Sequence, residues 1–280
     1  MFDPLQTTLP ALSAELLAAA LGAAAGQAVP LYQPRMWIPQ FPDYQQDAWS
    51  VRQVPMLTMK GYWGSPYLVA NTTMLMRHGR ESWMSVTPSE LESQELGCRL
   101  AQGHTVVLGF GMGIAACNAA LNPAVSKVTV VEYDPIVLDL AETAGIIAQL
   151  PVDIAAKVTL LQGDAHHWQP GEAVDTLLAD YWFPFYDPER LAEMRAVQAR
   201  VAAKQVFFWG QELNLAWLIH QRHGEVCALD DTALAELIAT DAGLPLLWPR
   251  GEDYGTAIST AARHWLPLAV RQGMRWPMPA

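Results

Sequence analysis

One stretch of this 280-residue chain, residues 104–135, limits the possible folds more than any other. It opens at 105–108 with a short, valine-rich run that is typical of a buried parallel strand. Glycines follow at alternate positions, at Gly109, Gly111 and Gly113. The small-residue segment 114–121 then predicts a helix. Glycine lets the backbone approach a ligand closely, and the first N–H groups of a helix are free to bind one. The stretch therefore predicts a strand, a binding loop and a helix.

The next strand predicts which kind of ligand this loop binds. Residues 128–131 are rich in valine and predict a strand that ends in Glu132, 19 positions after Gly113. An acidic side chain at this distance can accept hydrogen bonds from both hydroxyls of a ribose. The dinucleotide fingerprint G-x-G-x-x-G is not met, since Ile114 stands where a third glycine could first lie. We therefore expect a nucleoside site and disfavour a nicotinamide cofactor.

Strand and helix patterns continue to alternate downstream. Further strands are predicted at 158–161, 174–179 and 206–209, and helices at 136–149 and 187–204. This alternation predicts an α/β fold, a doubly wound and mostly parallel Rossmann-like sheet. Ligands of such sheets bind beyond the carboxyl ends of the strands. Predicted strands are followed by Gly109, Glu132, Asp164 and Asp180.

The glycine loop and the V-E-Y-D-P sequence at 131–135 resemble those of class I S-adenosylmethionine-dependent methyltransferases. They are also similar to those of the spermidine synthase-like aminopropyltransferases. The resemblance covers about residues 87–210 and implies S-adenosylmethionine as the cofactor. The residues implied to bind it are Gly109, Phe110, Gly111, Met112, Gly113, Glu132, Tyr133, Asp164 and Ala165.

The same resemblance implies roles for individual side chains. The loop 109–113 would pass beneath the methionine part of the cofactor and offer its backbone hydrogen bonds. Asp164 would take the adenine amino group, and Ala165 would donate its N–H to a ring nitrogen. A helix-capping role for Asp164 remains the alternative. His166 and His167 adjoin this place, and either is a possible histidine base.

Catalysis and acceptor binding are expected at the end of the fourth parallel strand. There Asp180 would orient the nucleophile or take its proton, with Tyr181 beside it. A capping or solvated aspartate is the alternative. The acceptor site would be walled by aromatic side chains, namely Trp182, Phe183 and Tyr186.

The residues before the parallel sheet predict a separate cap, 1–86, on a domain formed by 87–280. The Ala/Leu-rich segment 11–29 predicts a helix packed on the domain and no export signal, because no basic residue precedes it. Prolines and aromatics alternate over 30–67 and predict extended, turn-rich chain that covers the site. Two strands, 67–76 and 81–86, are predicted to form a hairpin.

Outside these motifs, a helix is predicted to begin near residue 87 and to end between residues 100 and 103. The region 211–280 is expected to be a helical extension, with helices at 213–220 and 231–240 and a strand at 244–248.

Composition limits the kinds of binding partner that we expect. The net charge of −11 and the absence of a Lys/Arg cluster disfavour nucleic acid, so we expect a small-molecule substrate. Cys98, Cys117 and Cys227 lack C-x-x-C spacing, which fits a reducing cytoplasm and predicts no metal site. We expect a cytoplasmic protein without a membrane segment, and a homodimer is compatible with the sequence.

The type of group transferred is the remaining choice. Aminopropyltransferases typically read G-G-G-D-G in the loop, and here Met112 stands at the acidic place. They also carry a second acid soon after the one that ends the fourth strand, whereas after Asp180 the next acid is Asp187. A diamine would leave one ammonium poorly paired, which is costly once water is excluded. We therefore expect methyl transfer to a small molecule, with aminopropyl transfer or non-catalytic nucleoside binding as alternatives.

Overall fold

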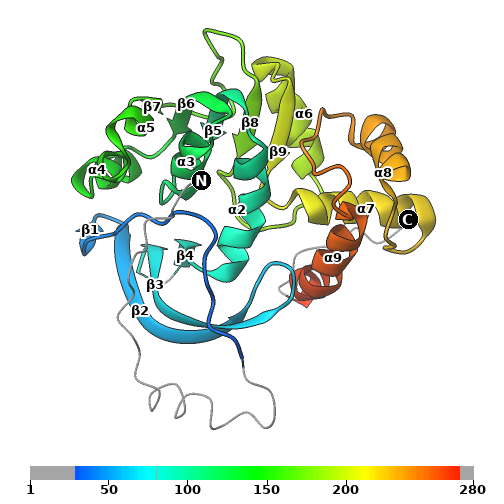
Figure 1. The fold of residues 1–280 in the computed structure, drawn as a ribbon, viewed down its shortest axis with the longest axis horizontal. Coiled ribbons are helices and arrows are strands. Elements are labelled where there is room, and N and C mark those ends of the chain that lie inside the picture. The colour runs from blue at the N-terminus through cyan, green and yellow to red at the C-terminus, as the bar shows by residue number, and fades with distance from the viewer. Residues whose placement is uncertain (1–28, 80, 272–280) are drawn as a thin grey trace.

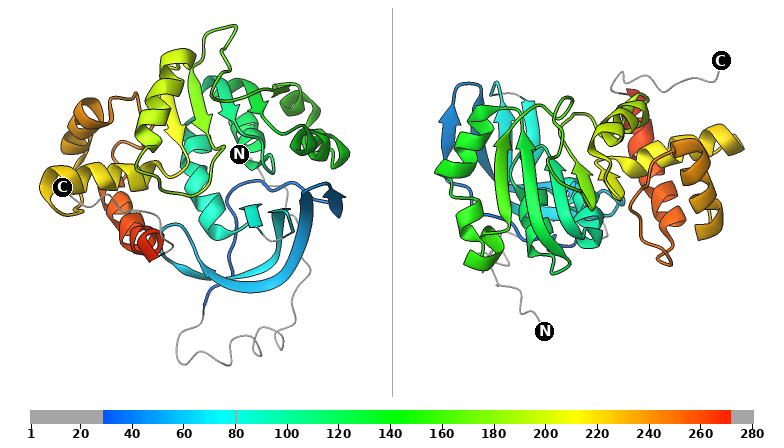
Figure 2. Two further views of the ribbon diagram at one scale, coloured as in Figure 1. Left: turned by 180° about the vertical axis from the view of Figure 1, so that it is seen from behind. Right: turned by 90° about the horizontal axis from the view of Figure 1, so that it is seen from above.

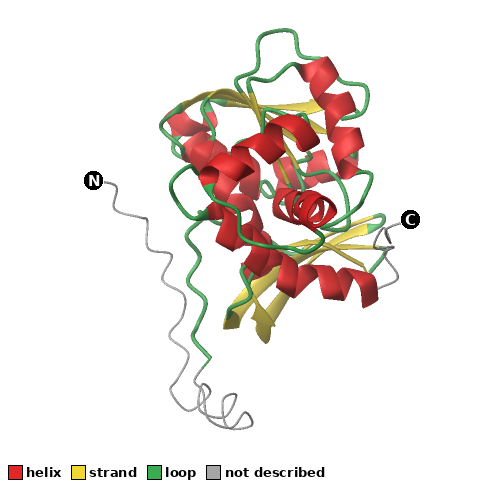
Figure 3. Ribbon diagram, turned by 90° about the vertical axis from the view of Figure 1, so that its right-hand side faces the viewer, coloured by secondary structure: helices red, strands yellow, loops and turns green. Residues whose placement is uncertain are grey.

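The computed structural model describes residues 29–79 and 81–271 and contains two β-sheets that share one hydrophobic core (Figure 1). Figure 3 shows the two layers of strands with helices lying between them. The helix predicted for 11–29 lies, except for its last residue, outside the described residues. The division at residue 87 stays a prediction, and the chain passes there from the first sheet into a helix.

The larger sheet confirms the predicted parallel, Rossmann-like architecture. Its strands are β5 (Gly103–Leu108), β6 (Val125–Glu132), β7 (Val158–Gln162), β8 (Thr176–Ala179) and β9 (Gln205–Phe208). They lie in the order β7-β6-β5-β8-β9, and all neighbours are parallel. Val106, Val107 and Leu108 of the central strand are fully buried, as expected of a strand covered on both faces.

The strand order reverses direction between β5 and β8. The chain moves outward from β5 through α3 (Ile114–Leu121) and α4 (Pro135–Thr143) to one edge, and later through α6 (Arg190–Val201) to the other. Right-handed crossovers then place α6 on the face opposite to α3 and α4. A crevice for a ligand forms at such a reversal, beyond the carboxyl ends of the strands.

All the loop glycines adopt positive φ, 89° at Gly109, 51° at Gly111 and 74° at Gly113. A Cβ atom on Gly109 would collide with the carbonyl oxygen of Asp180. One on Gly111 would lie 2.6 Å from Met84 Sδ, and one on Gly113 2.7 Å from the Phe110 ring. The glycines are therefore already required by packing within the protein.

The N-terminal sheet is antiparallel, with the order β1-β2-β3-β4. Its strands are β1 (Tyr44–Gln46), β2 (Trp49–Lys60), β3 (Pro66–Arg77) and β4 (Glu81–Ser85). The predicted hairpin is confirmed as β3 and β4, and His78 and Gly79 turn the chain with φ of 50° and 66°.

The long strand β2 lies where the prolines had predicted only extended, turn-rich chain. Strand β1 pairs only with residues 49–51 of β2, so Pro55 lies in a part of β2 that forms an edge of the sheet. The ladder to β3 also omits Pro55 and Asn71, the latter with φ of 54°. An edge position tolerates a residue without an N–H group, which explains the difference.

Helix α2 (Pro88–Leu100) connects the two sheets and has an unusual buried side. Thr87 precedes it and Pro88 is its first residue, a position that favours proline because its missing N–H group has no partner within the helix there. Four of its polar side chains are buried: Ser89, Glu92, Ser93 and Gln94. A helix that buries polar groups must satisfy them, and Ser93 Oγ accepts a bond of 2.9 Å from Trp209 Nε1.

Two predicted helices are shorter than expected, and one connection lacks a helix. Helix α4 ends at Thr143 because Gly145 follows with φ of 59°, and the chain continues into a 3₁₀ turn (Ile147–Gln149) and α5 (Val152–Ala155). Helix α6 ends at Val201, where Ala202 has φ of 51°. Between β7 and β8 the chain forms turns only.

The C-terminal region packs beside β9 as a group of helices (Figure 2). They are α7 (Gln211–His223), α8 (Asp231–Leu237), a π-helical turn (Ile238–Ala242) and α9 (Tyr254–Arg271). The strand predicted at 244–248 is reduced to one bridge between Leu246 and Val206. Within the described residues, every helix is too short or too polar to cross a bilayer.

A buried carboxylate joins the N-terminal sheet to these helices. Glu212 of α7 accepts hydrogen bonds from Tyr62 Oη (2.9 Å) and Tyr254 Oη (2.7 Å). The turn that carries Tyr62 also accepts a bond of 2.7 Å from Trp265 Nε1 at its carbonyl oxygen. Tyr62 itself is fully buried, so this turn is anchored in the helical region.

Tyr62→Phe should lower the free energy of unfolding, because it removes one of two hydroxyl donors from a buried carboxylate. The expected loss is about 1–3 kcal/mol. Urea denaturation of the full chain measures it. The matched control is Tyr133→Phe, since Tyr133 is 72% exposed, and it should leave the midpoint unchanged. Equal midpoints for the two variants would contradict the anchoring role of Tyr62.

Candidate active site

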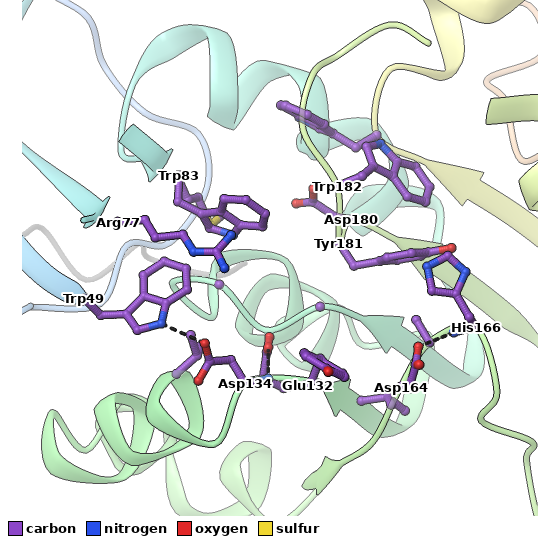
Figure 4. Close-up of a pocket in the computed structure, with 18 of the residues that line it drawn as sticks. Trp49, Arg77, Trp83, Glu132, Asp134, Asp164, His166, Asp180, Tyr181 and Trp182 are labelled. Atoms are coloured by element: carbon purple, nitrogen blue, oxygen red, sulfur yellow. Dashed lines mark hydrogen bonds between the residues drawn. The ribbon is translucent and has the colours of Figure 1, made fainter. Parts of the chain in front are cut away.

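A cavity of about 350 Å³ lies at the carboxyl ends of the parallel strands. This volume is within the range of small-molecule sites, about 300–1,000 Å³. The parallel-sheet domain contributes Glu90, Gly109, Gly111, Val131, Glu132, Tyr133, Asp134, Val137, Asp164, Ala165, His166, Asp180, Tyr181, Trp182 and Trp209 to its wall. The N-terminal sheet covers it with Trp49, Arg77, Trp83 and Met84. Figure 4 shows the labelled side chains converging from both parts.

The predicted ribose ligand, Glu132, is held in place by the backbone. Its side chain is 9% exposed, and its oxygens accept bonds from Phe110 N (2.7 Å) and Asp134 N (2.8 Å). Each carboxylate oxygen has a second lone pair. Glu132 therefore fixes the glycine loop against the end of β6 and can still accept from a ligand.

Most backbone amides of the glycine loop, which were predicted to bind the cofactor, donate to groups of the protein instead. Phe110 N donates to Glu132, and Met112 N lies 3.1 Å from Met84 Sδ. Gly109 N and Gly113 N donate to backbone carbonyls, those of Val131 and Phe110. Among these five amides, only that of Gly111 lacks an acceptor within the described residues.

The side chains of Phe110 and Met112 are buried in the core. Neither they nor Gly113 line the cavity, so in this conformation the loop presents Gly109 and Gly111 to a ligand.

Asp164 and Ala165 line the cavity at the end of β7, as predicted. Asp164 also stabilises its own turn, because it accepts bonds from His166 N and His167 Nδ1, both at 2.8 Å. These donors, the His166 N–H first, lower the pKa of Asp164, so it is an acceptor for a ligand N–H. The exposed ring of Tyr133 borders the same cavity.

Asp180 is paired with a second carboxylate that the sequence did not indicate. Gln94 Nε2 donates to Asp180 Oδ2 (2.8 Å) and to Glu90 Oε1 (3.2 Å), and both acids line the cavity. Burial raises the pKa of Asp180 to about 7. Burial and the nearby Asp180 charge raise the pKa of Glu90 well above its usual range. The pair therefore retains a proton near neutral pH.

The predicted aromatic wall is only partly present. Tyr181 and Trp182 line the cavity, whereas Phe183 is 63% exposed and Tyr186 is buried, and neither borders the cavity. The Tyr181 hydroxyl donates to Glu193, which lies outside the lining, at 2.9 Å. Trp182 is held by Arg190, whose guanidinium carbon lies 3.9 Å from the ring centroid. A catalytic role for Tyr181 stays a prediction.

Several lining residues were not singled out as site residues from the sequence, although Trp49 lies in the segment 30–67 that was predicted to cover the site. They are Trp49, Arg77, Trp83, Met84, Glu90, Asp134, Val137 and Trp209. One usable signal was the spacing of Glu90 and Gln94, which lie four residues apart and so share one side of the predicted helix. Trp49, Arg77, Trp83 and Met84 reach the cavity because the N-terminal sheet folds over the parallel one, and no local pattern reveals that.

No group of metal-binding side chains was found among the described residues. No protein-family model matches the chain, and no curated protein matches it.

Solved structures resemble this chain only in part. One is a glycopeptide N-methyltransferase, MtfA, complexed with sinefungin, with 22% identity over 39% of this chain and 42% of that one and a TM-score of 0.30. A DhpI–SAH complex has 18% identity, coverages of 39% and 48%, and a TM-score of 0.29. The methyltransferase domain of bacterial CtHen1 has 19% identity, coverages of 42% and 65%, and a TM-score of 0.34.

Each alignment spans less than two thirds of the other protein's chain. Likeness at this level carries no argument about function.

The raised pKa of Asp180 predicts a pH-dependent stability. An unfolded aspartate titrates near 4 and the folded one at about 7, so the folded state holds an extra proton between these values. Stability should therefore decrease as pH rises from about 4 through about 7. Asp180→Asn removes the contribution of Asp180 to this loss and should be more stable than the wild type at pH 8.

We expect a difference on the order of 1–3 kcal/mol, because one pKa unit is about 1.4 kcal/mol and the Asp180 side chain borders an open cavity. Urea denaturation at pH 5 and pH 8 measures it. Asp153→Asn, a surface change of the same charge, is the control. A wild type that is as stable as Asp180→Asn at pH 8 would contradict the burial of this charge.

Proposed function

We propose that the protein is an S-adenosylmethionine-dependent methyltransferase acting on a small-molecule acceptor. The observation that carries the proposal is the convergence of Glu132, Asp164 and Asp180, each at the end of a different parallel strand, on one cavity with the glycine loop. A lone glycine loop or a lone acid has a purely structural explanation, and the set together supports a nucleoside site.

The residues present fit the cofactor. Glu132 would hold the ribose hydroxyls, and Asp164 with Ala165 would hold the adenine edge. Gly111 N would be the donor toward the methionine part, because it is the loop amide without an acceptor in the described chain. When bound, S-adenosylmethionine supplies an electrophilic methyl group on a sulfonium. The acidic lining of the cavity complements that positive charge.

Asp180 would act on the acceptor. With a pKa of about 7 it is partly ionised at neutral pH and can accept a proton from an acceptor O–H or N–H. Gln94 fixes one oxygen of Asp180 and thereby orients the other. The cover formed by Trp49, Trp83 and Met84 would exclude water from the reacting groups.

Aminopropyl transfer is the second candidate, and one observation favours it. The sequence offered a single acid at the acceptor end, whereas Glu90 lies beside Asp180 in the folded chain. Two carboxylates could pair with the two ammonium groups of a diamine. The missing loop acid at Met112 still weighs against this reading.

Product analysis tests the proposal. The protein is incubated with a metabolite extract and either S-adenosylmethionine or its decarboxylated form, and the nucleoside products are identified by mass spectrometry. We expect S-adenosylhomocysteine. Asp180→Asn should slow its release by roughly 100-fold or more and should change the affinity for S-adenosylhomocysteine little. If methylthioadenosine is formed, and only from the decarboxylated form, the proposal of methyl transfer is wrong and the protein is an aminopropyltransferase.

A further inference from the structure

Arg77 is the residue of the cavity that the proposed reaction does not yet use. It is the last residue of β3 and lies opposite Trp49 in the ladder to β2. Its guanidinium carbon lies 5.5 Å from the centroid of the Trp49 ring and 5.3 Å from that of Trp83. Figure 4 shows the guanidinium between these indoles, pointing into the cavity.

The indoles fix the Arg77 side chain without neutralising it. Contacts of this kind attract a cation through the ring face, and they leave its N–H groups available. Arg77 has no hydrogen bond or ion pair with any residue in the described part of the chain. By contrast, Arg190 pairs with Glu193, and Arg99 with Glu252. Arg77 is thus a half-buried, oriented cation that faces a cavity.

Arg77 lies in a hairpin that contacts the glycine loop. Met84, next to Trp83 in β4, contacts Met112 N through its sulfur and lies against Gly111. The strands that carry Arg77 and Trp83 therefore lie directly over the loop, where the methionine part of the cofactor is expected.

The charges of the cavity select a ligand with one anionic group. Its acidic side chains are Glu90, Glu132, Asp134, Asp164 and Asp180. Arg77 is the only arginine or lysine in the lining formed by the described residues. S-Adenosylmethionine carries an ammonium and a sulfonium, which suit the acids, and one carboxylate, for which Arg77 is the available partner.

We propose that Arg77 binds the carboxylate of the methionine part of S-adenosylmethionine and so distinguishes it from the decarboxylated form. This inference rests on the proposed function and adds the residue that selects the cofactor. A guanidinium can bind a carboxylate through two parallel hydrogen bonds, which a lysine cannot reproduce. The decarboxylated form would place an ammonium end near Arg77 and leave the cation unpaired.

Calorimetry with two ligands tests the inference without relying on turnover. The ligands are S-adenosylhomocysteine and its decarboxylated analogue, which differ only in the carboxylate. The wild type should bind S-adenosylhomocysteine about 10- to 100-fold more tightly than the analogue. This comparison needs no variant.

The variants then assign the difference to Arg77. Arg77→Gln should weaken binding of S-adenosylhomocysteine by about 10- to 100-fold and change binding of the analogue by less than about 3-fold. Arg77→Lys keeps the charge, and its affinity for S-adenosylhomocysteine should lie between those of the wild type and Arg77→Gln. The matched control is Arg52→Gln, an exposed arginine on the neighbouring strand β2, which should bind both ligands like the wild type.

The outcomes separate this inference from the proposed function. If the wild type binds both ligands equally and Arg77→Gln binds S-adenosylhomocysteine normally, Arg77 does not read this carboxylate, and the nucleoside site remains. In that case the carboxylate of an acceptor becomes the candidate partner. If the wild type does not bind S-adenosylhomocysteine, both the inference and the proposed function are overturned.

Discussion

The carboxylate of Glu132 is the interaction on which the rest of the site depends. It accepts the amides of Phe110 and Asp134 and so fixes the glycine loop to the end of β6. Asp134, positioned in this way, caps α4 through Ile136 N and accepts a bond of 2.8 Å from Trp49 Nε1. Trp49 in turn forms one wall around Arg77. One buried acid thus connects the loop, the parallel sheet and the cover.

The end of the cavity near Asp180 depends on a second set of polar groups. Helix α2 brings Gln94 between Glu90 and Asp180, although both acids have a raised pKa there. Placing two carboxylates together in a cavity costs stability, and such an arrangement is found where a site must bind a cation or accept a proton. Its cost is offset by the large apolar core that the two sheets share.

Much of the fold could be predicted because its signals are local. Valine-rich runs marked the central strands, and α3 has the predicted bounds, 114–121, because a positive-φ glycine and Asn122 delimit it. The cover could not be predicted in the same way. Strand β2 tolerates Pro55 only because that part of it is an edge, and pairing between distant segments decides this.

The site was predictable where strand ends supply it and not where another element crosses it. Glu132, Asp164 and Asp180 lie in the cavity as expected, while Glu90 and Arg77 arrive from α2 and from the hairpin. The prediction that the loop amides bind the cofactor was wrong for two of them, because Glu132 and Met84 already accept their hydrogen bonds. Both acceptors are distant from the loop in sequence, so no local pattern shows these contacts.

The most direct test of this account is an experimental structure of the protein bound to S-adenosylhomocysteine. We expect the ribose hydroxyls on Glu132, the adenine beside Asp164 and Ala165, and the sulfur between the glycine loop and Asp180. A nucleoside bound outside this cavity, or one whose ribose makes no contact with Glu132, would contradict the account.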